Sequence, residues 1–190
     1  MIEIPFWFAE ALFALVWLAV RIVIRIRRGH IDWKREAVLL LWFVNLAVII
    51  RFTFFPMARV LGRVQPLRFE AAAAYPFKVN LVPFVNLFVY ESRRELLLNV
   101  MGNTAMFIPS GIVLPIVFKK LDSFWKVLLA GAALSLIIEL LQLPFFERTS
   151  DVDDLILNTL GVAIGYAIYA LVRKLRRNGA RRNDGQRIKR

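Results

Sequence analysis

Long runs of hydrophobic positions, each interrupted by only a few polar residues, dominate the chain. A helix that crosses a bilayer needs about 20 mostly apolar residues, and five stretches of the sequence approach that length. They cover residues 4–24, 37–55, 99–118, 124–146 and 155–172. The pattern therefore predicts an all-α, polytopic transmembrane helix bundle of about five spans, which fills residues 1–175 as a single unit.

The composition agrees with a membrane protein rather than with a soluble domain. Hydrophobic residues make up 59% of the 190 positions, whereas soluble domains are nearer half apolar. The chain has no cysteine and a single histidine. These counts exclude disulfides, zinc–thiolate sites, cysteine nucleophiles and multi-histidine metal sites.

The net charge of +12 is distributed unevenly along the chain. Basic residues concentrate in the segments 25–35, 119–126 and 173–190, which lie on one side of a five-span bundle. Because Lys and Arg are enriched in cytoplasmic loops, the pattern predicts that the N-terminus lies outside the cell and the C-terminus inside. The tail over 176–190 is expected to be flexible and cytoplasmic, and to attract anionic lipid rather than nucleic acid.

The longest segment between predicted spans covers residues 57–98. It contains Pro66, Pro76 and Pro83, so it is not one continuous helix. Its second half, residues 77–98, is too apolar for a free loop. We expect that half to be an interfacial or re-entrant piece that lies against the bundle.

Polar residues within and beside the predicted spans share helical faces and converge on the outer end of the bundle. Such groups are costly inside a bilayer and usually serve a function. The helical face that carries Asp151, Asp154 and Asn158 continues into Gly161 and Gly165, a spacing that permits close helix packing. The polar positions, at spacings of three or four residues, are Asn99 and Asn103, Glu139 and Gln142, and Asp151, Asp154 and Asn158.

Some of these residues also have an ordinary structural explanation. Asp151 or Asp154 would cap the last helix, and Asn99 would cap the third. Arg21, near the end of the first span, would extend its charge to the membrane interface. Glu139 resists this kind of explanation, because a carboxylate in the middle of a span gains no stability from its position.

Four short motifs follow one another between about residues 80 and 165. They are Asn80-Leu-Val-Pro-Phe84, Asn99-x-x-x-Asn103, Glu139-x-x-Gln142 and Arg148-x-x-Asp151-x-x-Asp154-x-x-x-Asn158. In this order and spacing the set resembles the VanZ-like family of bacterial membrane proteins. The resemblance implies a multi-pass protein of the bacterial plasma membrane with a role in the cell envelope. The family's named member is associated with resistance to the glycopeptide antibiotic teicoplanin.

The first functional hypothesis is a binding protein. A polar pocket on the outer side of the bundle would engage an envelope lipid, a lipid-linked cell-wall component or the glycopeptide, and would thereby reduce sensitivity to teicoplanin. The ligand-binding candidates are Asn80, Asn99, Asn103, Gln142, Arg148, Asp151 and Asn158.

The second hypothesis is an enzyme that acts on a lipid-linked substrate. Glu139 and Asp154 would be its catalytic residues, because two carboxylates in different environments can serve as acid and base. Asp151 and Asp154 could instead hold a divalent cation through oxygen ligands; no other cofactor is indicated. A small proton-coupled transporter that uses Glu139 is a third hypothesis, which the lack of an inverted repeat disfavours.

Overall fold

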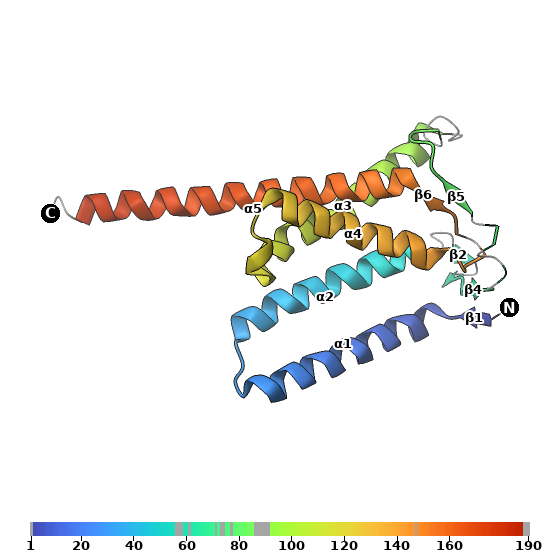
Figure 1. Cartoon of the computed structure of the whole chain (residues 1–190), viewed down its shortest axis with the longest axis horizontal. Helices are drawn as coiled ribbons and strands as arrows, with labels where there is room; N and C mark the ends of the chain where they lie inside the picture. Colours follow the sequence, from blue (N-terminus) through green and yellow to red (C-terminus); the bar gives the residue numbers. More distant parts are fainter. Residues whose placement is uncertain are drawn as a thin grey trace.

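Five long helices form the protein, in agreement with the prediction from hydropathy (Figure 1). The computed structural model describes residues 2–55, 59–60, 62–70, 72, 75–76, 78–85, 92–146 and 148–187. Each of the five helices is long and apolar enough to cross a membrane. The helices are α1 (Phe6–Arg28), α2 (Trp33–Phe54), α3 (Arg93–Val117), α4 (Phe124–Gln142) and α5 (Val152–Arg187), with a short 3₁₀ turn η3 (Lys119–Leu121) between α3 and α4.

The helix ends follow local capping chemistry rather than hydropathy. The Ser92 hydroxyl accepts a hydrogen bond from the Glu95 amide at 3.2 Å, so α3 starts at Arg93 and the prediction that Asn99 caps this helix is wrong. Helix α4 ends at Gln142, two residues before Pro144, which has no N–H to donate to the Leu140 carbonyl if the helix continued. Asp151 caps α5, since its Oδ1 accepts the Asp153 amide at 2.9 Å.

Helix α5 packs most extensively on α3, and glycines allow the two backbones to approach. A Cβ atom on Gly161 would collide with the Thr104 carbonyl oxygen, and one on Gly165 would collide with the Ile108 carbonyl oxygen. The predicted glycine face of the last span therefore lies directly against α3. Around this contact the apolar core is formed by Ile49, Phe107, Leu114, Val127, Ile138 and Val162.

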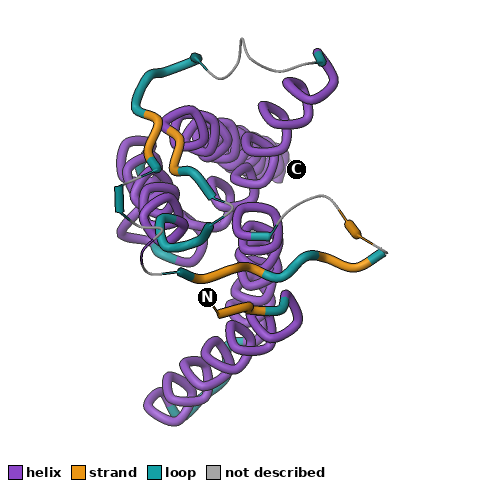
Figure 2. Tube along the Cα trace, turned by 90° about the vertical axis from the view of Figure 1, so that its right-hand side faces the viewer, coloured by secondary structure: helices purple, strands orange, loops and turns teal. Residues whose placement is uncertain are grey.

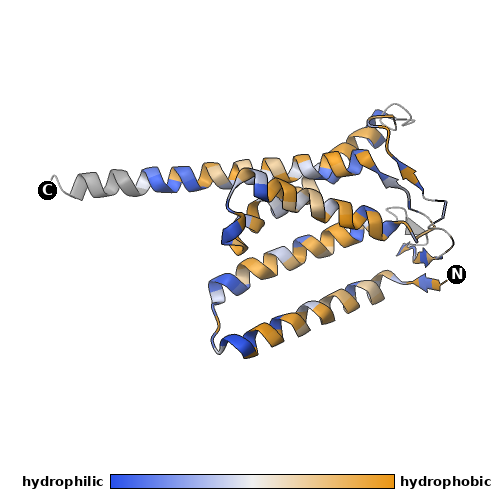
Figure 3. Cartoon of the chain, viewed as in Figure 1, coloured by the Kyte–Doolittle hydropathy of each residue, from blue (hydrophilic) through white to orange (hydrophobic). Residues whose placement is uncertain are grey.

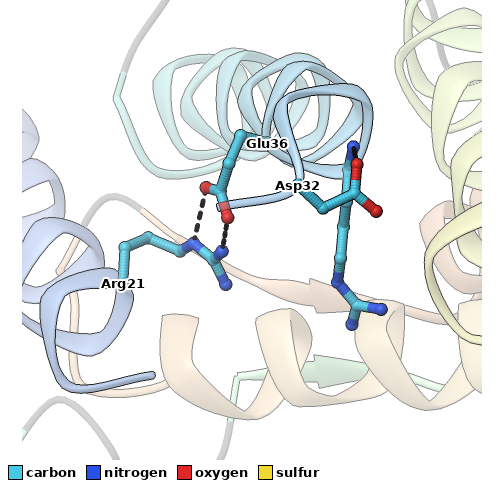
Figure 4. Close-up of polar contacts among 4 residues, drawn as sticks. Arg21, Asp32 and Glu36 are labelled. Carbon is cyan, nitrogen blue, oxygen red and sulfur yellow. Dashed lines mark hydrogen bonds and ion pairs between the residues drawn. The ribbon is translucent and has the colours of Figure 1, made fainter. Parts of the chain in front are cut away.

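Helix α1 lies at the edge of the bundle and contributes no buried residue. The Phe13 ring stacks on Phe43 of α2 with centroids 5.1 Å apart. Near the other end of α1, Arg21 forms an ion pair and two hydrogen bonds with Glu36 of α2 (Figure 4). Arg21 therefore joins two helices, which corrects the expectation that it only extends toward the membrane interface.

Short strands gather at one end of the bundle, called here the strand end, where α1, α3 and α5 begin and α2 and α4 end (Figures 1 and 2). Strand β1 (Ile2–Ile4) pairs antiparallel with β4 (Leu67–Phe69), and β2 (Arg59–Val60) pairs with β3 (Arg63–Val64). Strand β5 (Val79–Asn80) pairs parallel with β6 (Ser150–Asp151). The last pair brings the first predicted motif, which begins at Asn80, onto the start of α5.

The described part of segment 77–98 consists of β5, a turn at 83–85 and the first residues of α3. Residues 77 and 86–91 lie outside the described part of the chain, and entry of this segment into the bilayer stays a prediction. At the opposite end, α5 continues through Arg187, so residues 176–187 of the basic tail belong to the same helix as the last predicted span. Figure 3 shows hydrophobic positions along the helices and hydrophilic positions mainly near their ends.

Candidate functional site

A cavity of about 640 Å³ opens at the strand end, between α2, α3 and the segment that joins α4 to α5. Helices α2 and α3 contribute most of its apolar wall, through Phe52, Leu98, Ala105 and Met106. The polar wall comes from α3, the end of α4, the segment between α4 and α5, and the start of α5. Five of the predicted site residues line it: Asn99, Asn103, Gln142, Arg148 and Asp154.

Asn103 and Asp154 join the two central helices inside this cavity. The Asn103 side-chain amide donates a hydrogen bond to Asp154 Oδ1 at 2.5 Å. Asn99, one turn earlier on α3, lines the same cavity. No hydrogen bond of the Asn99 side chain occurs among the residues that the structure describes, so its amide is free to contact a ligand.

Gln142 and Arg148 hold the end of α2 against the cavity. Gln142 Nε2 donates to the Thr53 carbonyl at 2.5 Å, and Arg148 Nε donates to the Phe54 carbonyl at 2.8 Å. Both bonds satisfy carbonyls in the last turn of a helix, which lack partners within the helix itself. Gln142 Oε1 is buried and has no donor within the described part of the chain. The amide nitrogen of Gln142 therefore has a structural role, and its oxygen is available as an acceptor.

Glu139, Asp151 and Asn80 lie beside the cavity and do not line it. Only 4% of Glu139 is exposed, and its Oε2 accepts the Asp151 amide at 3.0 Å. Asp151 Oδ1 in turn accepts the Asn80 side-chain amide at 3.2 Å. The three residues hold β5 and β6 on the ends of α4 and α5.

Asn158 lies one turn of α5 beyond Asp154, deeper in the bundle. Its amide donates to the Ser135 hydroxyl at 2.9 Å, and both side chains are fully buried. Asn158 does not line the cavity. The contact ties α5 to α4, as expected for polar side chains between transmembrane helices.

Sequence reasoning missed several residues of this region. Asp153 is 4% exposed, and its Oδ1 accepts the Phe84 amide at 2.7 Å. Asp153 does not share a helical face with Asp151 and Asp154, so a search for polar residues at spacings of three or four did not include it. Glu95 lines the cavity and could have been found, because it precedes Asn99 by one helical turn. The remaining polar lining residues, Thr53 and Thr149, belong to no motif.

The charges beside Asp154 act on its carboxylate in opposite directions. Arg148 attracts the Asp154 carboxylate, while Asp151 and Asp153 repel it. Among the described residues no group of three or more histidine, cysteine or acidic side chains is arranged to hold a metal. Asp151 and Asp154 also accept hydrogen bonds from different asparagines. The two carboxylates therefore point to separate partners, which gives the divalent-cation hypothesis no geometric support.

Comparison with known proteins gives one family and one relative. The profile of the VanZ/LLP1 family matches residues 39–173. Protein VanZ of Enterococcus faecium is 33% identical over 96 residues, which cover 50% of this chain and 55% of the relative. The chain thus spans little more than half the length of that relative. No solved structure matches.

Proposed function

Because the chain belongs to the VanZ/LLP1 family, we propose that this multi-pass membrane protein acts in the bacterial plasma membrane and lowers sensitivity to teicoplanin-type glycopeptides. In this proposal the cavity at the strand end binds the polar part of an envelope lipid or lipid-linked component. The strand end faces outward, as the distribution of basic residues predicts.

One observation carries the proposal: the cavity holds polar groups that the fold leaves unused. Gln142 Oε1 is buried without a donor among the described residues. The half-buried Asn99 makes no side-chain hydrogen bond with them and lines the same cavity beside Arg148 and Asp154. Unpaired polar groups in a protein interior are costly. A headgroup with hydroxyl, amide or phosphate groups would satisfy them.

The same geometry favours binding over catalysis. Asp154 lines the cavity, whereas Glu139 is turned toward the Asp151 amide and does not line it. An acid and a base that act on one substrate must both reach it. The proposal therefore assigns Asp154 to ligand contact and Glu139 to positioning.

The test is the inhibitory concentration of teicoplanin for a susceptible bacterial host that expresses the protein. Asn99→Leu removes a cavity amide without removing a described hydrogen bond, and Asn178→Leu makes the same change at an exposed position of α5. We expect the wild type and Asn178→Leu to raise the inhibitory concentration several-fold and Asn99→Leu to lose most of that increase. A non-acylated glycopeptide serves as the comparison drug. Equal protection by both variants, at equal abundance in the membrane, would overturn the proposed cavity.

A further inference from the structure

A second hollow of about 590 Å³ follows the outside of the bundle between α2 and α3. Unlike the cavity, its wall is almost entirely apolar. Helix α2 provides Leu41, Val44 and Val48, and helix α3 provides Pro109, Ile112 and Val113. Val44 is 51% exposed, so the hollow is a groove open to whatever surrounds the bundle. It is called here the α2–α3 groove.

The α2–α3 groove adjoins the polar cavity. Ala105 and Met106 line both hollows. From Ala105 to Val113 the groove follows α3 for about 12 Å, at 1.5 Å per residue. The two hollows together are polar toward the strand end and apolar farther along α2 and α3.

The polar side chain on the floor of the groove is already hydrogen-bonded. Asn45 is the polar residue among those that line it. Its amide nitrogen donates to the Met106 carbonyl at 2.8 Å, and its oxygen accepts the Ser110 hydroxyl at 2.6 Å. These bonds fix α2 on α3 and leave an apolar surface above them. A hydrocarbon chain can occupy such a groove without desolvating an unpaired side chain.

We infer that the cavity and the α2–α3 groove together bind one membrane lipid, with its headgroup in the cavity and an acyl chain in the groove. The inference rests on the proposed function and specifies its ligand as an amphiphile. The headgroup would combine a phosphate with hydroxyl groups. Arg148 suits the phosphate, and the carboxylates of Asp154 and Glu95 suit the hydroxyls as acceptors.

The occupant is a lipid of the surrounding bilayer rather than a soluble molecule. Both helices that form the groove are long and apolar enough to span a membrane. The exposed Val44 therefore faces lipid, and an acyl chain can enter the groove from the side. The polar atoms of the cavity distinguish this arrangement from the non-specific lipid contacts of any transmembrane helix.

The experiment places the purified full-length protein in vesicles that contain phosphatidylglycerol with a photoreactive group on its acyl chain. Phosphatidylglycerol provides both the phosphate and the hydroxyls. After irradiation, mass spectrometry locates the label. Val44→Trp fills the groove, and Leu136→Trp is the matched control, because Leu136 on α4 is 48% exposed and lines neither hollow.

We expect several-fold more label at Met106 and Ile112 than at Leu136 and Ile137 of the wild type. Val44→Trp and Asn99→Leu should each reduce the groove label, and Leu136→Trp should not. Groove label equal to that on α4, or insensitive to Asn99→Leu, overturns the joined site. If Asn99→Leu nevertheless abolishes teicoplanin protection, the proposed function stands without the groove. If Asn99→Leu changes neither the label nor the protection, both proposals fall.

Discussion

The backbone amide of Asp151 donates a hydrogen bond to the buried carboxylate of Glu139, at 3.0 Å. This contact joins the last turns of α4 to the residue that caps α5. A carboxylate in the middle of a predicted span thus serves as the acceptor for the backbone amide at the end of β6. This hydrogen bond gives Glu139 a structural role that is independent of any catalytic role.

The first prediction separates this positioning role from acid–base chemistry. Glu139→Gln keeps a side-chain oxygen that can accept the Asp151 amide, whereas Glu139→Ala removes it. Loss of a partner for a buried group costs about 1–3 kcal/mol. We expect Glu139→Ala to lower the thermal unfolding temperature in detergent and Glu139→Gln to remain near wild type in unfolding and in teicoplanin protection. Loss of protection by a fully stable Glu139→Gln would support the enzyme hypothesis instead.

The second prediction concerns the hydrogen bond between Asn103 and Asp154. Because these residues connect α3 to α5 directly, Asn103→Ala and Asp154→Ala should not be additive. A double-mutant cycle on unfolding stability should give a coupling of about 0.5–3 kcal/mol. The pair Asn103→Ala and Asn158→Ala provides the comparison, since Asn158 contacts Ser135 instead. Strict additivity of the first pair would contradict the contact.

The third prediction concerns the glycines between α3 and α5. Gly161→Ala and Gly165→Ala place a methyl group against backbone carbonyls of α3, and overpacking of this kind costs on the order of 1–3 kcal/mol. Gly179→Ala is the matched control, because nothing lies near its Cβ position and alanine favours a helix. The thermal unfolding temperature should fall for Gly161→Ala and Gly165→Ala, and it should stay level or rise for Gly179→Ala. Three equal midpoints would show that the two helices are not closely packed.

The fourth prediction concerns the ion pair between Arg21 and Glu36. Arg21→Glu or Glu36→Arg alone places like charges together, so each should loosen α1 from α2 and increase proteolysis between them. The double exchange should restore most of the wild-type resistance, because it rebuilds the pair in reverse. The exposed pair Arg173–Asp122 is the control, and its exchange should have little effect. Failure of the double exchange to rescue would exclude the ion pair as the link.

The fifth prediction tests orientation. The chain has no cysteine, so each introduced cysteine is unique. In intact cells a membrane-impermeant maleimide should label Ile2→Cys at the strand end but not Lys120→Cys or Asn178→Cys at the opposite end. Permeabilised cells should show label at all three positions. The reverse pattern would place the cavity in the cytoplasm and remove the basis for contact with an outer-leaflet ligand.

Hydropathy predicted the number of helices well and their ends less well. Apolar periodicity reports the part of a helix that crosses hydrocarbon, so the third helix was expected to start at Asn99. The observed start at Arg93 depends on a serine cap and on polar helix-forming residues, which a search for apolar runs does not weigh. The end of α4 was predicted four residues late, at residue 146, because Leu143, Phe145 and Phe146 continue the apolar run beyond the helix.

The candidate site was predictable in its location but not in its division of roles. Helical spacing placed Asn103, Gln142 and Asp154 at one end of the bundle, and these residues do line one cavity. Spacing gives no information on contacts between distant segments. The pairing of Asn80 with Asp151, 71 positions later in the chain, is such a contact, and it turns both residues away from the cavity.

The parallel pairing of β5 with β6 also sets an order for biosynthesis. A ribosome delivers Asn80 and the first four membrane helices before the last helix is made. Because β6 immediately precedes α5, β5 acquires its partner only when the end of the hydrophobic region emerges. The cavity at the strand end is consequently completed last, and a chain released before residue 150 would carry its helices without a finished site.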